Sequence, residues 1–170
     1  MKSILFSLAL LLSLNAISGE LDNVFSSGVF GTKWGHSYDE IFKVFPEGEK
    51  ETSYGSTRIK VEDGREVLGI KRDSDSEIVF AFDANDRLYH VGVIFDGSDD
   101  FAKLMRKLDT LFGERAKDEE ANAPLMIKWK DEKTEISIIY VSGLFSSETV
   151  LGIQHLDLKK NTKSKEELGF

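Results

Sequence analysis

The chain has 170 residues, a formal net charge of −8 at pH 7 and no cysteine. The absence of thiols excludes a disulfide framework, a cysteine nucleophile and a cysteine metal site. The acidic charge makes nucleic acid and anionic membrane surfaces unfavourable partners, because both are bound through clustered lysine and arginine.

Residues 1–19 have the pattern of a secretory signal peptide. Lys2 is followed by a run of apolar and small residues over 4–14, and then by Ala16, Ser18 and Gly19. The run is shorter than the about 20 residues that a bilayer-spanning helix needs. We therefore expect a periplasmic or secreted protein, cleaved near Ser18 and Gly19, that does not insert into the membrane after cleavage.

The stretch GTKWGHSYDEIFKVFPEG, residues 31–48, predicts a short helix over residues 38–45. Ser37 is suited to the N-cap position, and Glu40 three residues later completes a capping box. Pro46 ends the helix. Capping therefore explains the polar residues of this stretch better than a reactive cluster does.

Two hairpins are expected in the next part of the chain, each with a turn signal between two strand-like segments. In the first hairpin, strands over residues 57–61 and 65–71 flank a turn at 62–64. In the second, strands over residues 77–82 and 87–95 flank a turn at 83–86. In the last strand the period of two places four residues on one face: Tyr89, Val91, Val93 and Phe95. His90 then points to the opposite face.

A second, longer helix is predicted over residues 99–112. Its apolar residues recur at spacings of three and four and form one stripe: Phe101, Leu104, Met105, Leu108, Leu111 and Phe112. Ser98 is suited to cap its start and Gly113 to end it. Three further strands are expected over residues 125–129, 134–141 and 149–158.

These elements predict an α+β domain over residues 20–158, in which two helices pack on one face of an antiparallel sheet. The helix ends at residues 39–51 and 106–118 align without a gap. We interpret residues 30–96 and 97–158 as two pseudo-repeated halves, each a helix followed by a meander of strands. Residues 159–170 are charged, and we expect them to be a flexible tail.

The segment WGHSYDEIFKVFP resembles the Gly-x-Ser/Thr-x-x-Glu-Val…Gly-x-Pro opening of small exported modules built from a helix and a β-meander. These modules include outer-membrane assembly accessory lipoproteins of the SmpA/OmlA type and β-lactamase-inhibitor-protein-like domains. The matching residues are Gly35, Ser37, Glu40, Ile41 and Pro46, followed by LFGE at 111–114 and Trp129 in the second half. The resemblance implies a non-catalytic protein of the cell envelope that acts through protein contacts.

The chain departs from these families in two ways. It has no lipoprotein cysteine, so a lipid anchor on the outer membrane is not expected. It also lacks the disulfides of the inhibitor domains, so inhibition of a β-lactamase is not carried over. No functional residue is transferred from either family.

No catalytic motif is visible. His36, His90 and His155 lie on three different elements, and none has the closely spaced partner that is typical of a zinc site. There is no Gly-x-Ser-x-Gly elbow, no phosphate-binding loop and no His-Glu-x-x-His. We therefore expect no catalytic residue, no metal ligand and no cofactor.

Four residues are candidates for an interface. Trp34 and His36 have no role in capping, while Leu144 and Phe145 form an apolar pair within the small-residue loop 142–148. We expect an exported, non-enzymatic binding or accessory protein of the bacterial cell envelope that acts through protein–protein contacts.

Two alternatives stay open. One is a small periplasmic hydrolase or metal-dependent enzyme that uses His36, His90 or His155. The other is a protein that binds a small ligand or a cation on the concave face of its sheet.

Overall fold

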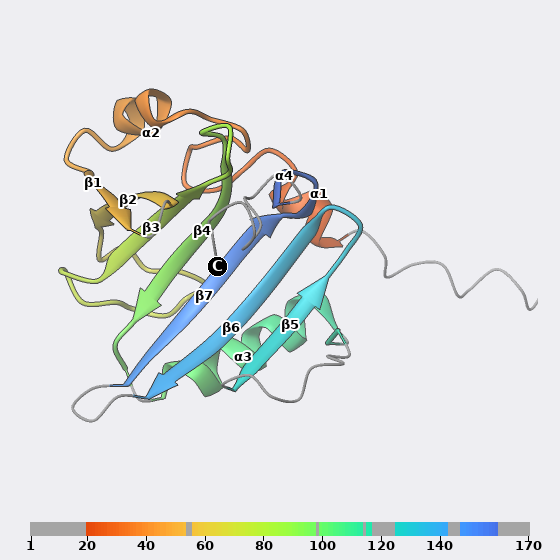
Figure 1. Ribbon diagram of the computed structural model, residues 1–170. Helices are drawn as coiled ribbons and strands as arrows, with labels where there is room; N and C mark the ends of the chain where they lie inside the picture. Colours follow the sequence, from red (N-terminus) through yellow and green to blue (C-terminus); the bar gives the residue numbers. More distant parts are fainter. Residues whose placement is uncertain are drawn as a thin grey trace, which may run out of the picture.

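The computed structural model describes residues 20–53, 56–97, 99–113, 115–116, 125–142 and 147–159. Within these ranges, seven strands form one antiparallel sheet in the order β1-β2-β3-β4-β7-β6-β5 (Figure 1). The strands are β1 (Glu49–Ser53), β2 (Ser56–Glu62), β3 (Glu77–Phe82), β4 (Leu88–Phe95), β5 (Met126–Lys130), β6 (Thr134–Ser142) and β7 (Ser147–His155). The helices are α1 (Glu20–Phe25), α2 (Tyr38–Val44), α3 (Asp100–Phe112) and α4 (Leu156–Lys159). The predicted α+β class with an antiparallel sheet is confirmed.

One face of the sheet carries the hydrophobic core. Val91, Val93 and Phe95 alternate along β4 and are all 0 % exposed. The long helix α3 covers this face, because Leu104 and Leu108 lie one turn apart on its apolar stripe and are buried against the sheet. Figure 1 shows α3 behind β5 and β6.

The short helix α2 packs on the same core at its other end. Ile41 is fully buried, and the ring of Phe45 lies 5.2 Å from that of Phe80 in β3. The Glu40 carboxylate accepts a hydrogen bond from the amide of Ser37 at 2.9 Å. The predicted capping residues therefore do begin this helix.

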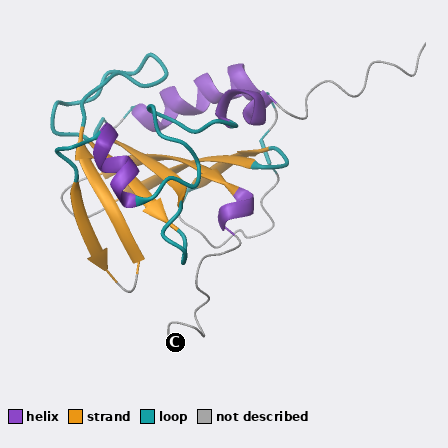
Figure 2. Cartoon of the chain, turned by 90° about the horizontal axis from the view of Figure 1, so that it is seen from above, coloured by secondary structure: helices purple, strands orange, loops and turns teal. Residues whose placement is uncertain are grey.

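The helices do not all lie on one side of the sheet. Figure 2 shows α3 on one side and α4 on the other, where α4 contacts β4 and β7. In the described chain, α2 is followed by a meander of four strands and α3 by a meander of three strands. The last strands of the two meanders, β4 and β7, pair at the centre of the sheet. The arrangement of two helices on one face and the internal duplication are not confirmed and stay predictions.

The first predicted hairpin is wrong. β2 pairs with β3, and residues 65–71 contain only an isolated bridge between Val67 and Ile70. The guanidinium of Arg72 donates to three backbone carbonyl oxygens, those of Asp63 at 2.5 Å, Glu77 at 2.7 Å and Ile94 at 2.8 Å. The loop is thus held against the sheet by Arg72, and its apolar residues enter the core without forming a strand.

The second hairpin is confirmed, with one correction in β4. Ala81 lies opposite His90, but the next residue of β3, Phe82, lies opposite Leu88. Tyr89 is therefore the extra residue of a β-bulge, and it does not share the core face with Val91. The bulge resets the alternation by one residue, which is why the strict period of two misplaced Tyr89.

Several boundaries also differ from the prediction. The long helix begins at Asp100, and β7 ends at His155, where a turn of helix replaces the expected end of the strand. The N-cap residue of the long helix is Asp99, where Ser98 was predicted. Ser98 itself and the segments 1–19 and 160–170 lie outside the described residues, so the signal peptide and the tail stay predictions. In the part of the chain that the structure describes, no helix has the length and apolar character needed to span a membrane.

Candidate functional site

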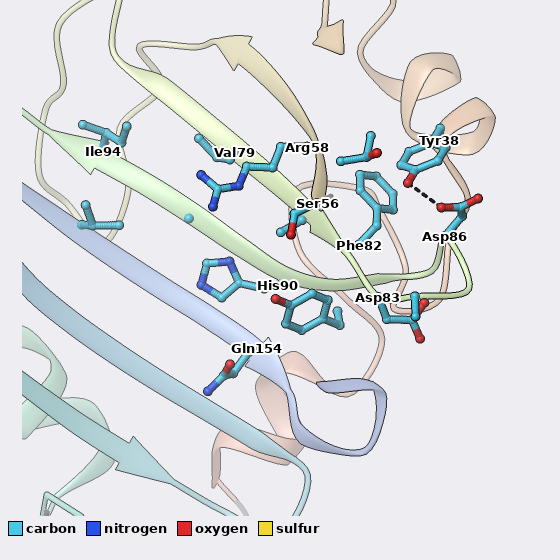
Figure 3. Close-up of a pocket in the computed structure, with 16 residues that line it drawn as sticks. Tyr38, Ser56, Arg58, Val79, Phe82, Asp83, Asp86, His90, Ile94 and Gln154 are labelled. Atoms are coloured by element: carbon cyan, nitrogen blue, oxygen red, sulfur yellow. Dashed lines mark hydrogen bonds between the residues drawn. The ribbon is translucent and has the colours of Figure 1, made fainter. Parts of the chain in front are cut away.

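A pocket of about 530 Å³ lies on the open face of the sheet, the face opposite α3. This open-face pocket is lined by Tyr38, Ser56, Thr57, Arg58, Val79, Ala81, Phe82, Asp83, Ala84, Asp86, Tyr89, His90, Gly92, Ile94, Val150 and Gln154. Strands β2, β3, β4 and β7 form its floor, while α2 and the β3–β4 turn close one end (Figure 3). Its volume falls within the range of about 300–1,000 Å³ that is typical of small-molecule sites.

The pocket forms because small residues separate long ones across the sheet. Arg58 lies opposite Ala81, and Ala81 lies opposite His90, so the three occupy one row on neighbouring strands. Strands are spaced about 4.8 Å apart, so the backbones of Arg58 and His90 are separated by about 10 Å. Ala81, between them on β3, contributes only a methyl group to this row.

Two glycines deepen the floor beside this row. Gly92 of β4 lies directly opposite Gly152 of β7. A Cβ added to Gly152 would lie 2.9 Å from His90 Nε2 and 2.9 Å from Ser137 Oγ, while one added to Gly92 would lie 3.5 Å from His90 Cε1. The imidazole of His90 therefore lies over the space that these glycines leave open.

The surroundings of His90 keep its imidazole neutral. Burial lowers the pKa of His90 from its ordinary value of 6.5 to about 4, and the positive charges of Arg58 and Lys159 act in the same direction. A neutral imidazole has one donor nitrogen and one acceptor nitrogen. His90 therefore offers hydrogen bonding to the pocket without a charge.

Arg58 is the cation of the pocket (Figure 3). Among the residues that the structure describes, its guanidinium has no hydrogen-bond or ion-pair partner. Glu51 lies directly opposite on β1 but contacts Lys60 instead, with 3.6 Å between the ammonium and a carboxylate oxygen. Lys60 is also paired with Glu77 at 2.8 Å. Arg58 is left as an uncompensated positive charge in a concave surface.

A hydrogen bond closes the α2 end of the pocket. The hydroxyl of Tyr38 donates to Asp86 Oδ1 at 2.6 Å (Figure 3), and the Tyr38 ring lies 4.2 Å from that of Phe82. Burial, followed by the bond to Asp86, raises the pKa of Tyr38. Asp86 has a φ of 57°, a left-handed conformation that aspartate adopts more readily than bulkier residues do.

The second carboxylate at this end, Asp83, serves the turn itself. Its side chain is 0 % exposed and accepts hydrogen bonds from the backbone amides of Asn85 and Arg87. The Arg87 guanidinium binds its other oxygen at 2.8 Å. Asp83 is thus neutralised by Arg87 and fixes the shape of the β3–β4 connection.

The interface candidates predicted from the sequence lie elsewhere or outside the described residues. The Trp34 indole donates to the carbonyl oxygen of Phe25 at 2.6 Å, and its ring lies 6.0 Å from that of His155. His36 Nδ1 accepts the amide of Lys33 at 3.2 Å. Neither Trp34 nor His36 lines the pocket. The other two candidates, Leu144 and Phe145, are not among the described residues.

The structure does not bring the three histidines together. His36 precedes α2, His90 lies in the pocket, and His155 ends β7 beneath Trp34. Over the described ranges, no group of three or more His, Asp or Glu side chains is arranged to hold a metal ion. Among the described residues, the three histidines therefore do not form one shared site, and the enzyme alternative stays a prediction.

Sequence reasoning placed His90 away from the core face but missed Arg58 and Tyr38. A signal for Arg58 was present, because it alternates with Ile59 and Val61 and so faces away from the core. Nothing local indicated Tyr38, which reaches the pocket from a helix 48 residues away from its partner Asp86.

No family model, curated protein or solved structure matches this chain. The resemblance to SmpA/OmlA-type modules and inhibitor-like domains therefore stays a prediction.

Proposed function

We propose that this is an exported, non-enzymatic binding protein that holds a small organic molecule in the open-face pocket. The observation that carries the proposal is Arg58, a guanidinium without an internal partner among the described residues, in a pocket of about 530 Å³. Arg58 is exposed in the free protein, so its N–H donors are available to a ligand that enters the pocket.

Binding is favoured over catalysis by the surroundings of His90. A nucleophilic enzyme needs a hydroxyl or thiol within hydrogen-bond reach of its base. Ser137 lies on the other side of Gly152 from His90, and no hydrogen bond joins His90 to a hydroxyl or carboxylate in the described part of the chain. The pocket thus has groups that recognise a ligand but no assembled pair that would attack one.

The proposed location is the periplasm or the exterior, and the pattern of residues 1–19 supports it. Protein–protein contact through Trp34 or His36 stays a prediction. Both side chains already contact their own chain, Trp34 through Phe25 and His36 through Lys33.

The test is a screen of a small-metabolite library by thermal shift, on the protein lacking residues 1–19. A ligand at about 100 times its Kd adds about 2.7 kcal/mol to the free energy of unfolding. Gly92→Val places methyl groups in the pocket, where a Cβ would lie 3.5 Å from His90 Cε1, and its folding is checked by its own melting transition without ligand. Thr52→Val, on exposed β1 outside the pocket, is the matched control.

We expect ligands that stabilise the wild type and Thr52→Val but not Gly92→Val. Ligands that stabilise Gly92→Val as well as the wild type would place the binding site elsewhere and contradict the proposal.

A further inference from the structure

We infer that the ligand is an amphipathic organic carboxylate, with its carboxylate held between Arg58 and His90 and its apolar part lying over Val79, Ile94 and Val150. This inference rests on the proposed function, because it names the class of ligand that the same pocket takes.

The first step is the charge of the ligand. A guanidinium presents paired N–H donors that match the two oxygens of a carboxylate. Arg58 is the pocket's unpaired cation within the described residues, since the adjacent Lys60 is engaged by Glu51 and Glu77. One positive charge suits a monoanion. A doubly charged phosphate is disfavoured, because Asp86 lines the same pocket.

The second step is the place of the carboxylate. Arg58 and His90 lie in one row of the sheet on either side of Ala81, and all three line the pocket. A neutral imidazole can donate one hydrogen bond to a carboxylate without a second charge to desolvate. The low pKa of His90 keeps it in that form at neutral pH. A carboxylate bound between Arg58 and His90 therefore meets a charged donor from β2 and a neutral donor from β4.

The third step is the direction of the apolar part. The α2 end of the pocket carries the Tyr38–Asp86 pair, while Ile94 lies at the opposite end (Figure 3). Ile94 is directly opposite Val150 on β7, and both belong to the pocket lining with Val79. A chain or ring running from Arg58 towards Ile94 buries apolar surface and leaves the Asp86 carboxylate at the other end.

The experiment is a titration calorimetry series with ligands of equal length: octanoate, octan-1-ol, octylamine and octyl phosphate. 4-Phenylbutanoate adds a ring in place of the chain. The proteins are the wild type, Arg58→Gln, Gly92→Val and a control, Lys60→Gln. Lys60 lies two residues along β2 on the same face but outside the pocket lining. Because the Arg58 side chain has no partner among the described residues, its replacement leaves the fold intact.

We expect at least one of the two carboxylates to bind the wild type at least tenfold more tightly than octan-1-ol, octylamine and octyl phosphate. Arg58→Gln should weaken that binding at least tenfold, and Lys60→Gln should leave it within about twofold, since Lys60 lies outside the pocket lining and is already paired with Glu51 and Glu77.

Other outcomes overturn the inference in distinguishable ways. The carboxylate class is rejected if the alcohol, amine or phosphate binds as tightly as the carboxylates or more tightly. It is also rejected if Arg58→Gln binds the carboxylate as tightly as the wild type does, or if no carboxylate binds. In each of these cases the proposed function survives if some ligand binds the wild type and Gly92→Val abolishes it. Carboxylate binding that Gly92→Val does not reduce rejects the pocket itself, and with it both proposals.

Discussion

Arg58 of β2 and His90 of β4 lie in one row of the sheet, with Ala81 of β3 between them, on the side of the sheet that α3 leaves uncovered. Burial lowers the pKa of His90 to about 4, and the positive charge of Arg58 acts in the same direction. The pair gives the pocket one permanent cation and one neutral hydrogen-bonding ring. Four predictions follow the contacts of this pocket and of the residues around it.

The first concerns pH and stability. Burial, then Arg58 and Lys159, depress the pKa of His90 from 6.5 to about 4. Between these two values the unfolded chain binds more protons than the folded one, so the free energy of unfolding rises with pH. The contribution is fully present above pH 6.5, falls as pH drops towards 4, and has a slope of at most about 1.4 kcal/mol per pH unit.

Replacing the titrating ring removes this contribution. Urea unfolding at several pH values should show that the difference in unfolding free energy between wild type and His90→Gln grows as pH rises from 4 to 6.5 and is constant above. Parallel curves over that interval would show that the folded-state pKa of His90 is not depressed.

The second prediction concerns Gly152. An alanine Cβ there would lie 2.9 Å from both His90 Nε2 and Ser137 Oγ, closer than real contacts allow. We expect Gly152→Ala to push the imidazole off the floor and to destabilise the fold by about 1–3 kcal/mol, the usual range for overpacking. In an NMR titration the pKa of His90 should rise towards 6.5 as the ring becomes hydrated.

Gly92→Ala is the matched control for that change, because its Cβ would have 3.5 Å to the nearest atom. We expect a loss of less than about 1 kcal/mol, within the range of substitutions that create no clash. Equal effects of the two alanines would contradict the arrangement of the ring over Gly152.

The third prediction concerns the Tyr38–Asp86 hydrogen bond of 2.6 Å that joins α2 to the β3–β4 turn. Tyr38→Phe should lower the free energy of unfolding by about 1 kcal/mol, the usual net value of one hydrogen bond. A double-mutant cycle with Asp86→Asn, which keeps a residue suited to a φ of 57°, measures the coupling directly. A coupling free energy near zero would mean that the bond does not stabilise the fold.

The fourth prediction separates Trp34 from the pocket. Its indole bonds to Phe25 and packs against His155, and it does not line the pocket. Trp34→Ala should therefore destabilise the protein by about 2–4 kcal/mol, somewhat less than for a fully buried tryptophan. Ligand affinity of the folded fraction should be unchanged. Weaker ligand binding with an unchanged free energy of unfolding would instead assign Trp34 to ligand recognition.

Local sequence patterns were sufficient to predict the elements that are stabilised by residues close together in the sequence. The stripe of α3 and the capping pair Ser37 and Glu40 lie within a few residues of one another, so spacing alone predicted both helices. The alternation of residues 77–82 predicted β3 with its observed bounds. The core face of β4 was predicted at Val91, Val93 and Phe95 for the same reason.

Local patterns did not predict which strands pair with each other. Residues 65–71 have strand-like composition, yet β3 takes the place beside β2. Arg72 holds the intervening loop against the sheet through carbonyl oxygens as far along the chain as Ile94, a contact that local sequence patterns do not indicate. The bulge at Tyr89 likewise reflects the pairing of two strands and not the sequence of either one.

By itself, the sequence therefore determined the fold class, the two longer helices, most strands and an acidic composition without cysteine. Only the tertiary structure decided where a site lies. Arg58, Ala81 and His90 come from three strands, and each alone is an ordinary residue on a solvent-facing side. Register across the sheet places them in one row, and register depends on long-range pairing and burial that no local spacing encodes.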